Sequence, residues 1–523
     1  MIDPGPDFYK AVASAKPRNT LRGGNPREGY PLRRARSESF DATWLRSNPK
    51  QLVALCRLQS ADTPLVVTTR RRKINHVIRT GLRPNFLFVD EEGNPQKKTN
   101  KLFSRRFKKW SRRVEGKSTK NIKISFATTQ RLARNELFSS GEFFVKKIID
   151  RSDPTQSPLR LQLIDRDQLD TSVNKQTDSG YIKQGIEYNA KDQEVAYWMY
   201  TRYPGDALIG THKSVRIPAD WMIHVFDPER VTQRVGVPEA SSTVMTNGDL
   251  EDYLGAALQQ ARSDAQNYGI LTGGAEAEDL QAFNSPNQVA DGPTPDCSYW
   301  PVEWGQDGEL SNETVINMDG GGRITVLPEG KFEAPNPNTP NSNLPQFAAT
   351  QSRRAALPVG NSYELSTGDF SQTSFSGAMA AGQHSAVDFE CDQFIFIEKF
   401  LDIVMEWWLE TEWLYGPPEV KRLLSDYGVD PDQYMMQIGW QYNGEQTLNP
   451  LQNVNAAAKK VELGISSRRT EAAAIGENFD DNMENQLEEL DVLIAREKKR
   501  LELLRLTEER TALEAGKSGQ EEG

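Results

Sequence analysis

The fold is decided by the run NLPQFAATQSRRAALPVGNSYELSTGDFSQTSFSGAMAAGQHSAVDFECDQFIFIEKFLDIVMEWWLETEWLY (343–415). Its residues predict a basic helix, a polar loop and a long apolar helix. The first helix carries Arg353 and Arg354 and stops at Pro358, which cannot continue a helix without losing a backbone hydrogen bond. Residues 360–382 are rich in Ser, Thr, Gly and Asn and almost uncharged, which favours a hydrated loop.

The long apolar helix is predicted from about Ser385 to Leu414. Its apolar side chains recur at helical spacing and form one stripe, which predicts burial against several neighbours. The stripe consists of Ile397, Phe400, Leu401, Val404 and Trp408, and it is widened by Phe389, Phe394, Trp407 and Trp413. A rigid buried helix is therefore expected to anchor the polar loop.

Length and composition set the broad class. The chain has 523 residues, of which 37% are hydrophobic and 26% charged, with a net charge of −10. This length allows roughly two to four domains. No apolar run approaches the roughly 20 residues needed to span a bilayer, so no membrane partner is expected. The first residues lack the regions of a signal peptide, so the cytoplasm is the expected compartment.

The cysteines predict neither disulfides nor a thiolate metal site. Cys56, Cys297 and Cys391 lie far apart and without CxxC spacing, so we expect three buried thiols. The charge is uneven: residues 70–134 contain 20 Lys or Arg against four Asp or Glu. Such a segment can neutralise phosphates of a nucleic acid, form a solvated face, or contact an acidic neighbouring subunit, and the sequence leaves the three open.

The remaining elements alternate between helix and strand. Helices are expected at 41–58, with Asp41 as N-cap, and at 97–113, 125–139, 249–268, 420–427 and 481–515, with two more around a turn at Gly464. The helix at 249–268 would begin with Asp249, Glu251 and Asp252, which suit the positive end of a helix dipole. Strands are expected at 65–67, 86–89, 143–149, 159–164, 182–187, 195–200, 215–217, 222–225, 314–318, 322–327 and 435–440. The fold class is α+β.

Catalytic signatures are absent. No GxxxxGK[ST] loop occurs, which argues against a P-loop motor, and the four histidines are isolated. His384 and Ser385 read as a polar pair at a helix start, because no GxSxG elbow frames them. Asp165 and Asp167 could bind a metal, but a β-turn uses the same residues. The interpretation is a protein without enzymatic activity, metal or cofactor.

Several runs, in this order, carry a family resemblance. They are ELFSSGEFFVKK, LRLQLIDRDQLD, RIPADWMIHVFDPERVTQRVGVP, GDLEDYLGAALQQA, and then ITVLPEGKFEAPNPNTPNSNLPQFAATQSRRAALPVG and NPLQNVNAAAKKVELGISSRRTEAAAIGENFDD. Together they resemble the lambda-type family of tailed-bacteriophage portal proteins over roughly residues 40–490. Two departures are VIRTGLRPNF, where the family usually has a Gly-rich turn, and SFSGAMAAGQHS, where an Arg often follows the small residues.

The resemblance implies a portal fold with a wing, a two-helix stem, a clip insertion, a tunnel loop with a long kinked helix, and a helical crown. Carried onto this sequence, it gives an N-terminal arm at 1–40, the wing at 41–248, the stem helices at 249–272 and 344–358, the clip at 273–343, the tunnel loop at 359–376, the long helix and wing return at 377–449, the crown at 450–515 and a disordered tail at 516–523.

The function implied is that of a dodecameric ring at the unique capsid vertex. Double-stranded DNA would pass through it, independently of sequence, during packaging and ejection. The expected partners are the terminase large subunit, the major capsid or scaffolding protein and a head-tail adaptor. The protein would reside in the virion after assembly in the host cytoplasm.

Candidate functional residues follow from the same resemblance. The tunnel loop would present Thr367, Asp369, Ser371, Gln372, Thr373 and Ser374 to DNA. Arg353 and Arg354 are candidates for a basic belt in the stem, or they pair with acids of the adjacent subunit. In the clip, Tyr299, Trp300 and Trp304 would dock the motor and adaptor.

Two other protein classes remain open on the sequence. A capsid or head-completion protein would also be polar and poor in cysteine, but it needs no helix pair around an insertion. A nuclease would need clustered carboxylates or histidines, which the sequence does not offer. The copy number of the ring, the host and the residues that face the channel do not follow from the sequence.

Overall fold

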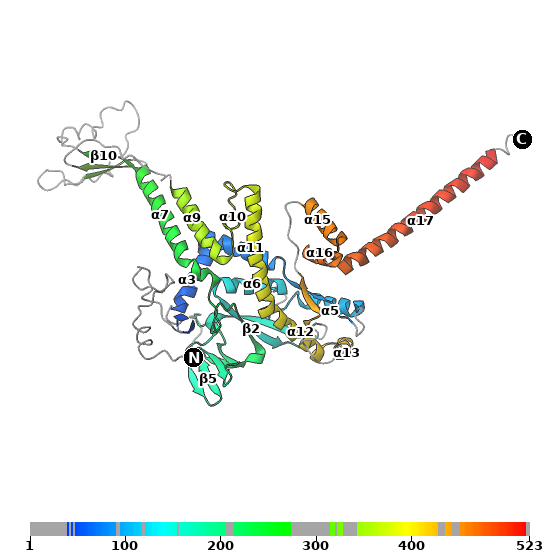
Figure 1. The fold of residues 1–523 in the computed structure, drawn as a ribbon, viewed down its shortest axis with the longest axis horizontal. Coiled ribbons are helices and arrows are strands. Elements are labelled where there is room, and N and C mark those ends of the chain that lie inside the picture. The colour runs from blue at the N-terminus through cyan, green and yellow to red at the C-terminus, as the bar shows by residue number, and fades with distance from the viewer. Residues whose placement is uncertain are drawn as a thin grey trace, which may run out of the picture.

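The computed structural model describes residues 39–40, 43–44, 48–89, 95–117, 121–153, 156–205, 213–272, 314–318, 322–327, 343–426, 435–441, 450–477 and 479–518. Helices and strands are both abundant, which confirms the mixed class. A central body holds the main sheets, while α7 and α9 extend from it on one side and α17 on the other (Figure 1). Residues 1–38 of the expected arm, most of the clip expected at 273–343, and residues 519–523 of the expected tail lie outside the described residues. Residues 516–518, also expected in the disordered tail, belong to α17, so that prediction is wrong for them.

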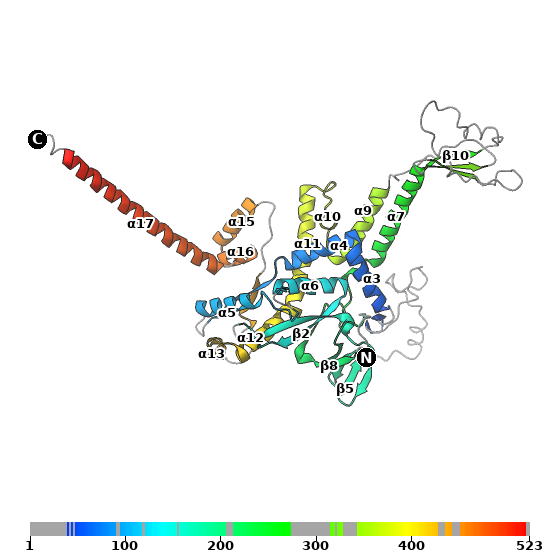
Figure 2. The same cartoon turned by 180° about the vertical axis from the view of Figure 1, so that it is seen from behind.

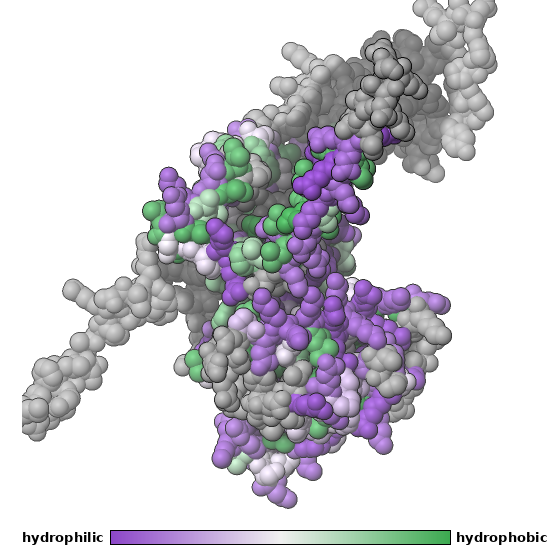
Figure 3. All heavy atoms as spheres, turned by 90° about the vertical axis from the view of Figure 1, so that its right-hand side faces the viewer, coloured by the Kyte–Doolittle hydropathy of each residue, from purple (hydrophilic) through white to green (hydrophobic). Residues whose placement is uncertain are grey.

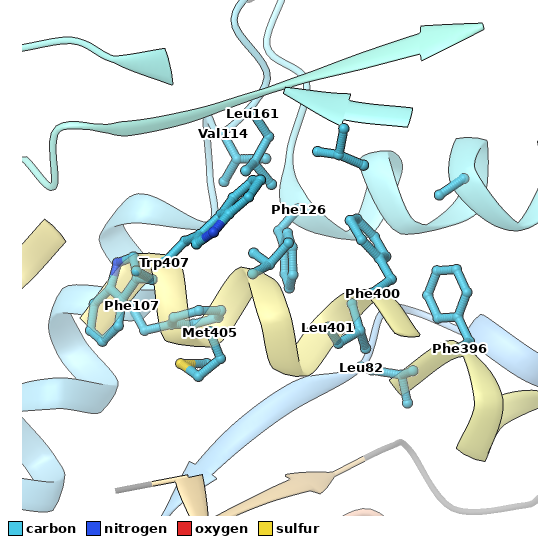
Figure 4. Packing of buried hydrophobic residues seen from close by; sticks show 14 of the residues in the cluster. Leu82, Phe107, Val114, Phe126, Leu161, Phe396, Phe400, Leu401, Met405 and Trp407 are labelled. Carbon is cyan, nitrogen blue, oxygen red and sulfur yellow. The ribbon is translucent and has the colours of Figure 1, made fainter. Parts of the chain in front are cut away.

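The main hydrophobic core lies between a three-stranded antiparallel sheet and several helices. The sheet has the order β3-β2-β9, with Phe143 opposite Asp165 on one side and Val225 on the other. Side chains from α5, α6 and α12 fill the space beside it (Figure 4). Phe400 lies edge-on to Phe143, with ring centroids 5.5 Å apart. The elements are β2 (Glu142–Ile149), β3 (Leu159–Asp165), β9 (Met222–Phe226), α5 (Lys97–Trp110), α6 (Phe126–Ser139) and α12 (Asp402–Tyr415).

The predictions for α5, α6, α12 and the strands of this sheet are confirmed. They could be made because the apolar residues of these elements recur with a clear period. The α6 helix begins after Ser125, whose hydroxyl accepts from the Thr128 backbone as an N-cap. On α5, Phe103, Phe107 and Trp110 are buried. The helix ends at Trp110, slightly before the expected Arg113.

A second sheet is a five-stranded antiparallel meander of β4 (Lys175–Thr177), β5 (Gly180–Lys183), β6 (Ile186–Asn189), β7 (Glu194–Tyr200) and β8 (Ser214–Pro218). The single strand expected at 182–187 is wrong. Gln184 and Gly185 both have positive φ, 53° and 79°, and form the turn of the β5–β6 hairpin. A 3₁₀ turn (Ala219–Trp221) leads from β8 into β9 and so joins the two sheets.

The N-terminal helices differ from the expectation. The strand expected at 65–67 is wrong: these residues begin α4 (Pro64–Ile78), with Pro64 in the first turn. The preceding helix is α3 (Pro49–Asp62), while 41–42 and 45–47, with the expected cap Asp41, lie outside the described residues. The next strand is β1 (Arg83–Phe86), which pairs with β13 (Ile438–Gln441).

Two long helices lie side by side and lead away from the body (Figures 1 and 2). They are α7 (Val244–Gln266) and α9 (Leu344–Ala356), and Tyr253 meets Phe347 at 4.5 Å between them. The expected start of α7 is wrong by about five residues, so Asp249, Glu251 and Asp252 lie beyond its first turn. Past α7 comes β10 (Asn267–Thr272), so the stem helix expected at 249–272 is wrong for its last six residues. The strands β11 (Thr314–Met318) and β12 (Gly322–Leu327) lie at the predicted positions and pair antiparallel.

The long apolar helix is interrupted by a π-helical turn. It consists of α11 (Phe375–Phe396), the π turn (Ile397–Leu401) and α12 (Asp402–Tyr415). Such turns change the direction of a helix. Most of the predicted stripe is buried, but Phe394 is 66% exposed and Trp413 36% exposed. His384 and Ser385 lie inside α11, not at a helix start, since α11 begins ten residues before the expected position.

The C-terminal part consists of α13 (Pro418–Asp426), α15 (Pro450–Glu462), α16 (Arg468–Ala474) and α17 (Phe479–Ser518). The turn at Gly464 is confirmed, with φ 70°.

Of the described cysteines, Cys56 is buried as expected. Cys391 is exposed, so the prediction of a buried thiol is wrong for it, and Cys297 lies outside the described residues. No helix within the described part of the chain is long and apolar enough to cross a membrane.

Candidate nucleic-acid interface

The predicted polar loop is a short helix and a tight turn rather than a long flexible segment. After α9 comes a 3₁₀ turn (Leu357–Val359), then α10 (Tyr363–Thr367), and α11 begins at Phe375. The loop expected at 359–376 therefore reduces to the link at 360–362 and the turn at 368–374. Sequence composition suggested a loop because Ser and Thr favour turns, but here Ser362 and Ser374 are N-caps of α10 and α11.

The link at 360–362 is fixed to the body. Gly360 has a positive φ of 77°, which favours glycine. The buried side chain of Asn361 donates from Nδ2 to the carbonyl of Thr69 on α4, at 2.9 Å. The Ser362 backbone donates to Ser385 Oγ on α11, at 3.1 Å. Helices α4, α9, α10 and α11 are thus joined at one point.

The turn at 368–374 is closed by its own side chains. Gly368, with φ 75°, ends α10. Asp369 Oδ1 accepts from both the backbone and the hydroxyl of Ser371, at 3.0 and 2.6 Å. Thr373 Oγ1 donates to Glu364 at 3.2 Å. The turn is therefore a defined structure with exposed polar groups.

The turn is connected to α9 through an aromatic ring. The Arg353 guanidinium lies 4.7 Å from the centre of the Tyr363 ring, and the Tyr363 hydroxyl donates to Asp369 Oδ2 at 3.1 Å. Burial and the hydrogen bond to Asp369 raise the pKa of Tyr363. The hydrogen bonds from Ser371, and then that from Tyr363, lower the pKa of Asp369. Asp369 is therefore a stable anion beside an ordered cation.

The structure brings the predicted turn residues and one of the two arginines together. Thr367 Oγ1 bonds back to the Tyr363 carbonyl, and Gln372 is exposed. Arg354 is also exposed and donates to Gln351 at 3.5 Å, the long end of hydrogen bonding. The predicted docking residues Tyr299, Trp300 and Trp304 lie outside the described residues.

An ionic cluster, which the sequence did not indicate, connects the helices that carry the turn at 368–374 to the rest of the body. Lys73 on α4 and Arg134 on α6 both contact Glu239 and Asp392, at 2.5–3.1 Å. Glu239 precedes α7 and Asp392 lies on α11. Although burial opposes its ionisation, Arg134 and Lys73 hold the pKa of Glu239 at about 2. The four charges connect the base of α7 to α11. Because the four residues lie far apart in the sequence, no local pattern predicts that they meet.

The basic stretch at 70–134 is not one continuous face. Besides Lys73 and Arg134, Arg106 pairs with the fully buried Glu412, at 2.7 Å, and Lys101 pairs with Glu484 of the same chain, at 3.0 Å. Other cations remain at the surface: Arg71, Arg72, Lys97, Lys98, Arg105 and Lys108. Part of the stretch thus forms internal contacts, while the remainder stays available to an anionic partner.

Asp165 and Asp167, which could have bound a metal, form ion pairs with an arginine instead. Arg57 binds both carboxylates, at 2.7 and 2.6 Å, and Asp165 caps a short 3₁₀ turn. Within the described ranges, no group of three or more His, Cys, Asp or Glu side chains is placed to hold a metal ion.

The chain matches a protein family and a curated relative. The family described as phage portal protein, lambda family, matches residues 32–393. A curated relative described as a probable portal protein, from Halomonas phage phiHAP-1, is 28% identical over 395 residues, which cover 74% of this chain and 70% of the relative.

Solved structures of gene transfer agent particles are also similar. A chain of the native particle neck, computed with C12 symmetry, has 13% identity and a TM-score of 0.40, over 82% of this chain and 94% of that chain. A chain of the native virion has 12% identity and a TM-score of 0.38, over 82% and 93%.

Proposed function

The chain belongs to the lambda family of phage portal proteins, and from this premise we propose that it forms a dodecameric ring whose axial channel passes double-stranded DNA. The observation that carries the proposal is the family match over residues 32–393. That match spans the β3-β2-β9 sheet, the five-stranded sheet, α7, α9, α10 and most of α11. The family is a structural one, and we propose no catalytic role.

The parts of a portal are assigned to the chain as follows. The wing comprises 41–248 and 377–449, the stem 249–272 and 344–358, the clip 273–343, the tunnel loop 359–376 and the crown 450–515. The pairing of α7 with α9 supports the stem, because Tyr253 and Phe347 hold together two helices that lead to one sheet. The π turn between α11 and α12 supports the kinked helix.

We place the turn at 368–374 at the channel wall. DNA carries one negative charge per about 1.7 Å of its axis, so a wall that bound phosphates tightly would slow translocation. The turn offers small polar groups and one anion, Asp369, which is exposed. Contacts of this type are made with the backbone of DNA and are independent of sequence.

Arg353 adds a cation that is held in place. Its stacking on Tyr363 orders the guanidinium, and the Tyr363 hydroxyl contacts Asp369. The cation contacts the Tyr363 ring and the anion accepts from its hydroxyl, so the net charge near the turn is small. We infer that the ring of turns guides DNA by weak, balanced contacts.

The proposed partners follow from the same role. The ring would sit at one vertex of the virion, in contact with the major capsid or scaffolding protein. The clip, through Tyr299, Trp300 and Trp304, would bind the terminase large subunit and later a head-tail adaptor. Replacement of these three residues by Ala should leave rings intact and weaken that binding.

Electron microscopy of the purified protein tests the proposal. Rings with an axial hole, wide enough for a DNA duplex, are the expected result. Shells, or closed assemblies without that hole, would overturn the proposal. A compact monomer would do the same.

A further inference from the structure

The helix α5 carries a dense row of cations on its exposed side. At 3.6 residues per turn, these cations fall within about 120° of the helix circumference, opposite the buried Phe103, Phe107 and Trp110. The stretch 97–117 contains a single acidic residue, Glu115, which is only 4% exposed. We call this set the α5 row; it consists of Lys97, Lys98, Lys101, Arg105, Lys108 and Lys109.

The chain itself supplies few anions to the α5 row. Lys101 pairs with Glu484 at the start of α17, at 3.0 Å. Beyond that residue α17 leads away from α5 in both views (Figures 1 and 2). Among the described residues, Lys97, Lys98, Arg105 and Lys108 form no ion pair. Like charges four residues apart destabilise a helix, so a row of this kind is stabilised when an anion binds along it.

The composition of the α5 row favours phosphates over a protein surface. The centre of a protein interface is rich in apolar and aromatic side chains and poor in Lys. The exposed side of α5 has no large apolar residue, and all but one of its cations are Lys. The lower part of the described surface is mostly hydrophilic when it is viewed from the side on which α5 lies in Figure 1 (Figure 3). Exposed Lys and Arg of this kind are typical of contacts with the backbone of a nucleic acid.

The length of the α5 row suits a DNA duplex. At 1.5 Å per residue, the distance along the helix from Lys97 to Lys109 is roughly 18 Å. A duplex carries one charge per about 1.7 Å of its axis, so that length presents roughly ten phosphates. The row can therefore neutralise several phosphates at once, and it does so without reading the bases.

The position of α5 in the molecule decides which DNA it meets. The strand β10, which follows α7, lies at one end of the molecule, while α5 and α17 lie on the other side of the body (Figures 1 and 2). In the proposed ring the clip, on the β10 side, binds the packaging motor outside the capsid. The side that carries α5 then faces the interior of the capsid, where the packaged DNA lies.

We propose that the α5 row is a second DNA-binding site of the ring, outside the channel, which holds packaged double-stranded DNA by its phosphates. The site differs in charge from the turn at 368–374, where Asp369 balances Arg353 and contacts are weak. The α5 row has cations alone, and it is repeated in every copy of the ring. The inference rests on the ring of the proposed function and adds a site to it.

Circular DNA separates this site from the channel. A covalently closed duplex circle cannot be threaded through a ring that has already assembled. Rings of the full-length chain are therefore purified first and then mixed with such a circle, and binding is measured by sedimentation over a series of salt concentrations. We expect unmodified rings to bind the circle, with an affinity that falls steeply as salt rises.

The test variant removes three charges from each copy of the α5 row. It combines Lys98→Gln, Arg105→Gln and Lys108→Gln, and all three side chains are exposed, so the core contacts of α5 are kept. Binding of the circle should weaken for any DNA sequence. The slope of log affinity against log salt should become smaller by about one for each phosphate contact that is lost.

The matched control removes the same charge elsewhere. It combines Lys175→Gln, Lys191→Gln and Lys213→Gln, at exposed positions in and beside the five-stranded sheet. These rings should bind the circle with the affinity and the salt slope of unmodified rings.

The outcomes separate this inference from the proposed function. Equal weakening in the two triple variants would show a response to net charge alone and would overturn the α5 site. Unmodified rings that do not bind the circle at low salt would also overturn it, while the portal function stands. Loss of rings in the α5 variant alone would show that the row binds an acidic surface of the neighbouring copy instead of DNA. The absence of rings in the unmodified protein would count against the proposed function itself.

Discussion

Arg134 and Glu239 form a buried bidentate ion pair, with Nη1 2.5 Å from Oε1 and Nη2 3.1 Å from Oε2. Lys73 and Asp392 complete a cluster of two cations and two anions. Arg134 is only 2% exposed, so its charge is compensated by these carboxylates and not by water. The cluster fixes the base of α7 against α6 and α11, the helices that carry the candidate channel elements.

Removing the guanidinium should destabilise the protein strongly. In Arg134→Met the apolar stem is largely kept, but Glu239 and Asp392 are left with Lys73 alone. Breaking a buried pair costs about 3–5 kcal/mol. Urea unfolding should show a loss of that order. The matched control is Arg131→Met, one turn earlier on α6 and exposed, for which we expect a loss below about 1 kcal/mol. Equal losses in the two variants would contradict the assigned role of the cluster.

Stability should fall in acid because of Glu239. Its pKa is about 2 in the folded chain against an ordinary value near 4.5. The unfolded chain therefore binds a proton first as pH falls, and the contribution of Glu239 is complete above pH 4.5 and lost as pH falls toward 2. The free energy of unfolding of Glu239→Gln should accordingly vary less with pH in this window. Parallel pH profiles for the two proteins would show that Glu239 is not the responsible group.

The elements that the sequence predicted well are those whose side chains repeat with a clear period. On α5, Phe103, Phe107 and Trp110 recur every three or four residues and are buried. The α4 helix was missed because Leu65, Val66 and Val67 are typical of a strand locally. Its buried residues further along, such as Val77, pack into the main core and decide the outcome.

The candidate site was predictable only in part. The residues of the turn follow from the order of helix, polar run and apolar helix, together with the family resemblance. The length of the loop could not be predicted, because serines such as Ser374 suggest a loop by composition although they cap helices in the structure. The contact of Asn361 with Thr69 and the pairing of Lys73 with Asp392 join residues about 300 positions apart, and a single sequence carries no signal for them.

Asn361 should hold the link between α9 and α10 in place. In Asn361→Ala the carbonyl of Thr69 loses its side-chain donor in a buried position, which costs about 1–3 kcal/mol. Hydrogen exchange of the α10 amides should become faster, while the amides of β2, remote from this contact, should be unchanged. Unchanged exchange in α10 would mean that the caps Ser362 and Ser374 hold the segment without Asn361.

The last prediction concerns the charge of the turn. Asp369→Lys removes the acceptor of Ser371 and Tyr363 and places a second cation near Arg353. In a ring, this change repeats in every copy and makes the wall basic. We expect normal rings, because Asp369 is exposed and its side-chain hydrogen bonds, among the described residues, stay within the segment 363–371.

DNA packaging by Asp369→Lys rings should be slower, since phosphates would be held at the turn. The defect should weaken as salt is raised, because salt screens contacts between exposed charges and phosphates. Asp369→Asn is the matched control: its amide oxygen can still accept from Ser371, and it adds no cation. It should package at nearly the normal rate. Packaging rates that are equal in Asp369→Lys and the unmodified ring at low salt would place the turn away from DNA. A defect shared by both variants would instead point to the loss of the Asp369 anion, because both variants lack it and only one carries a new cation.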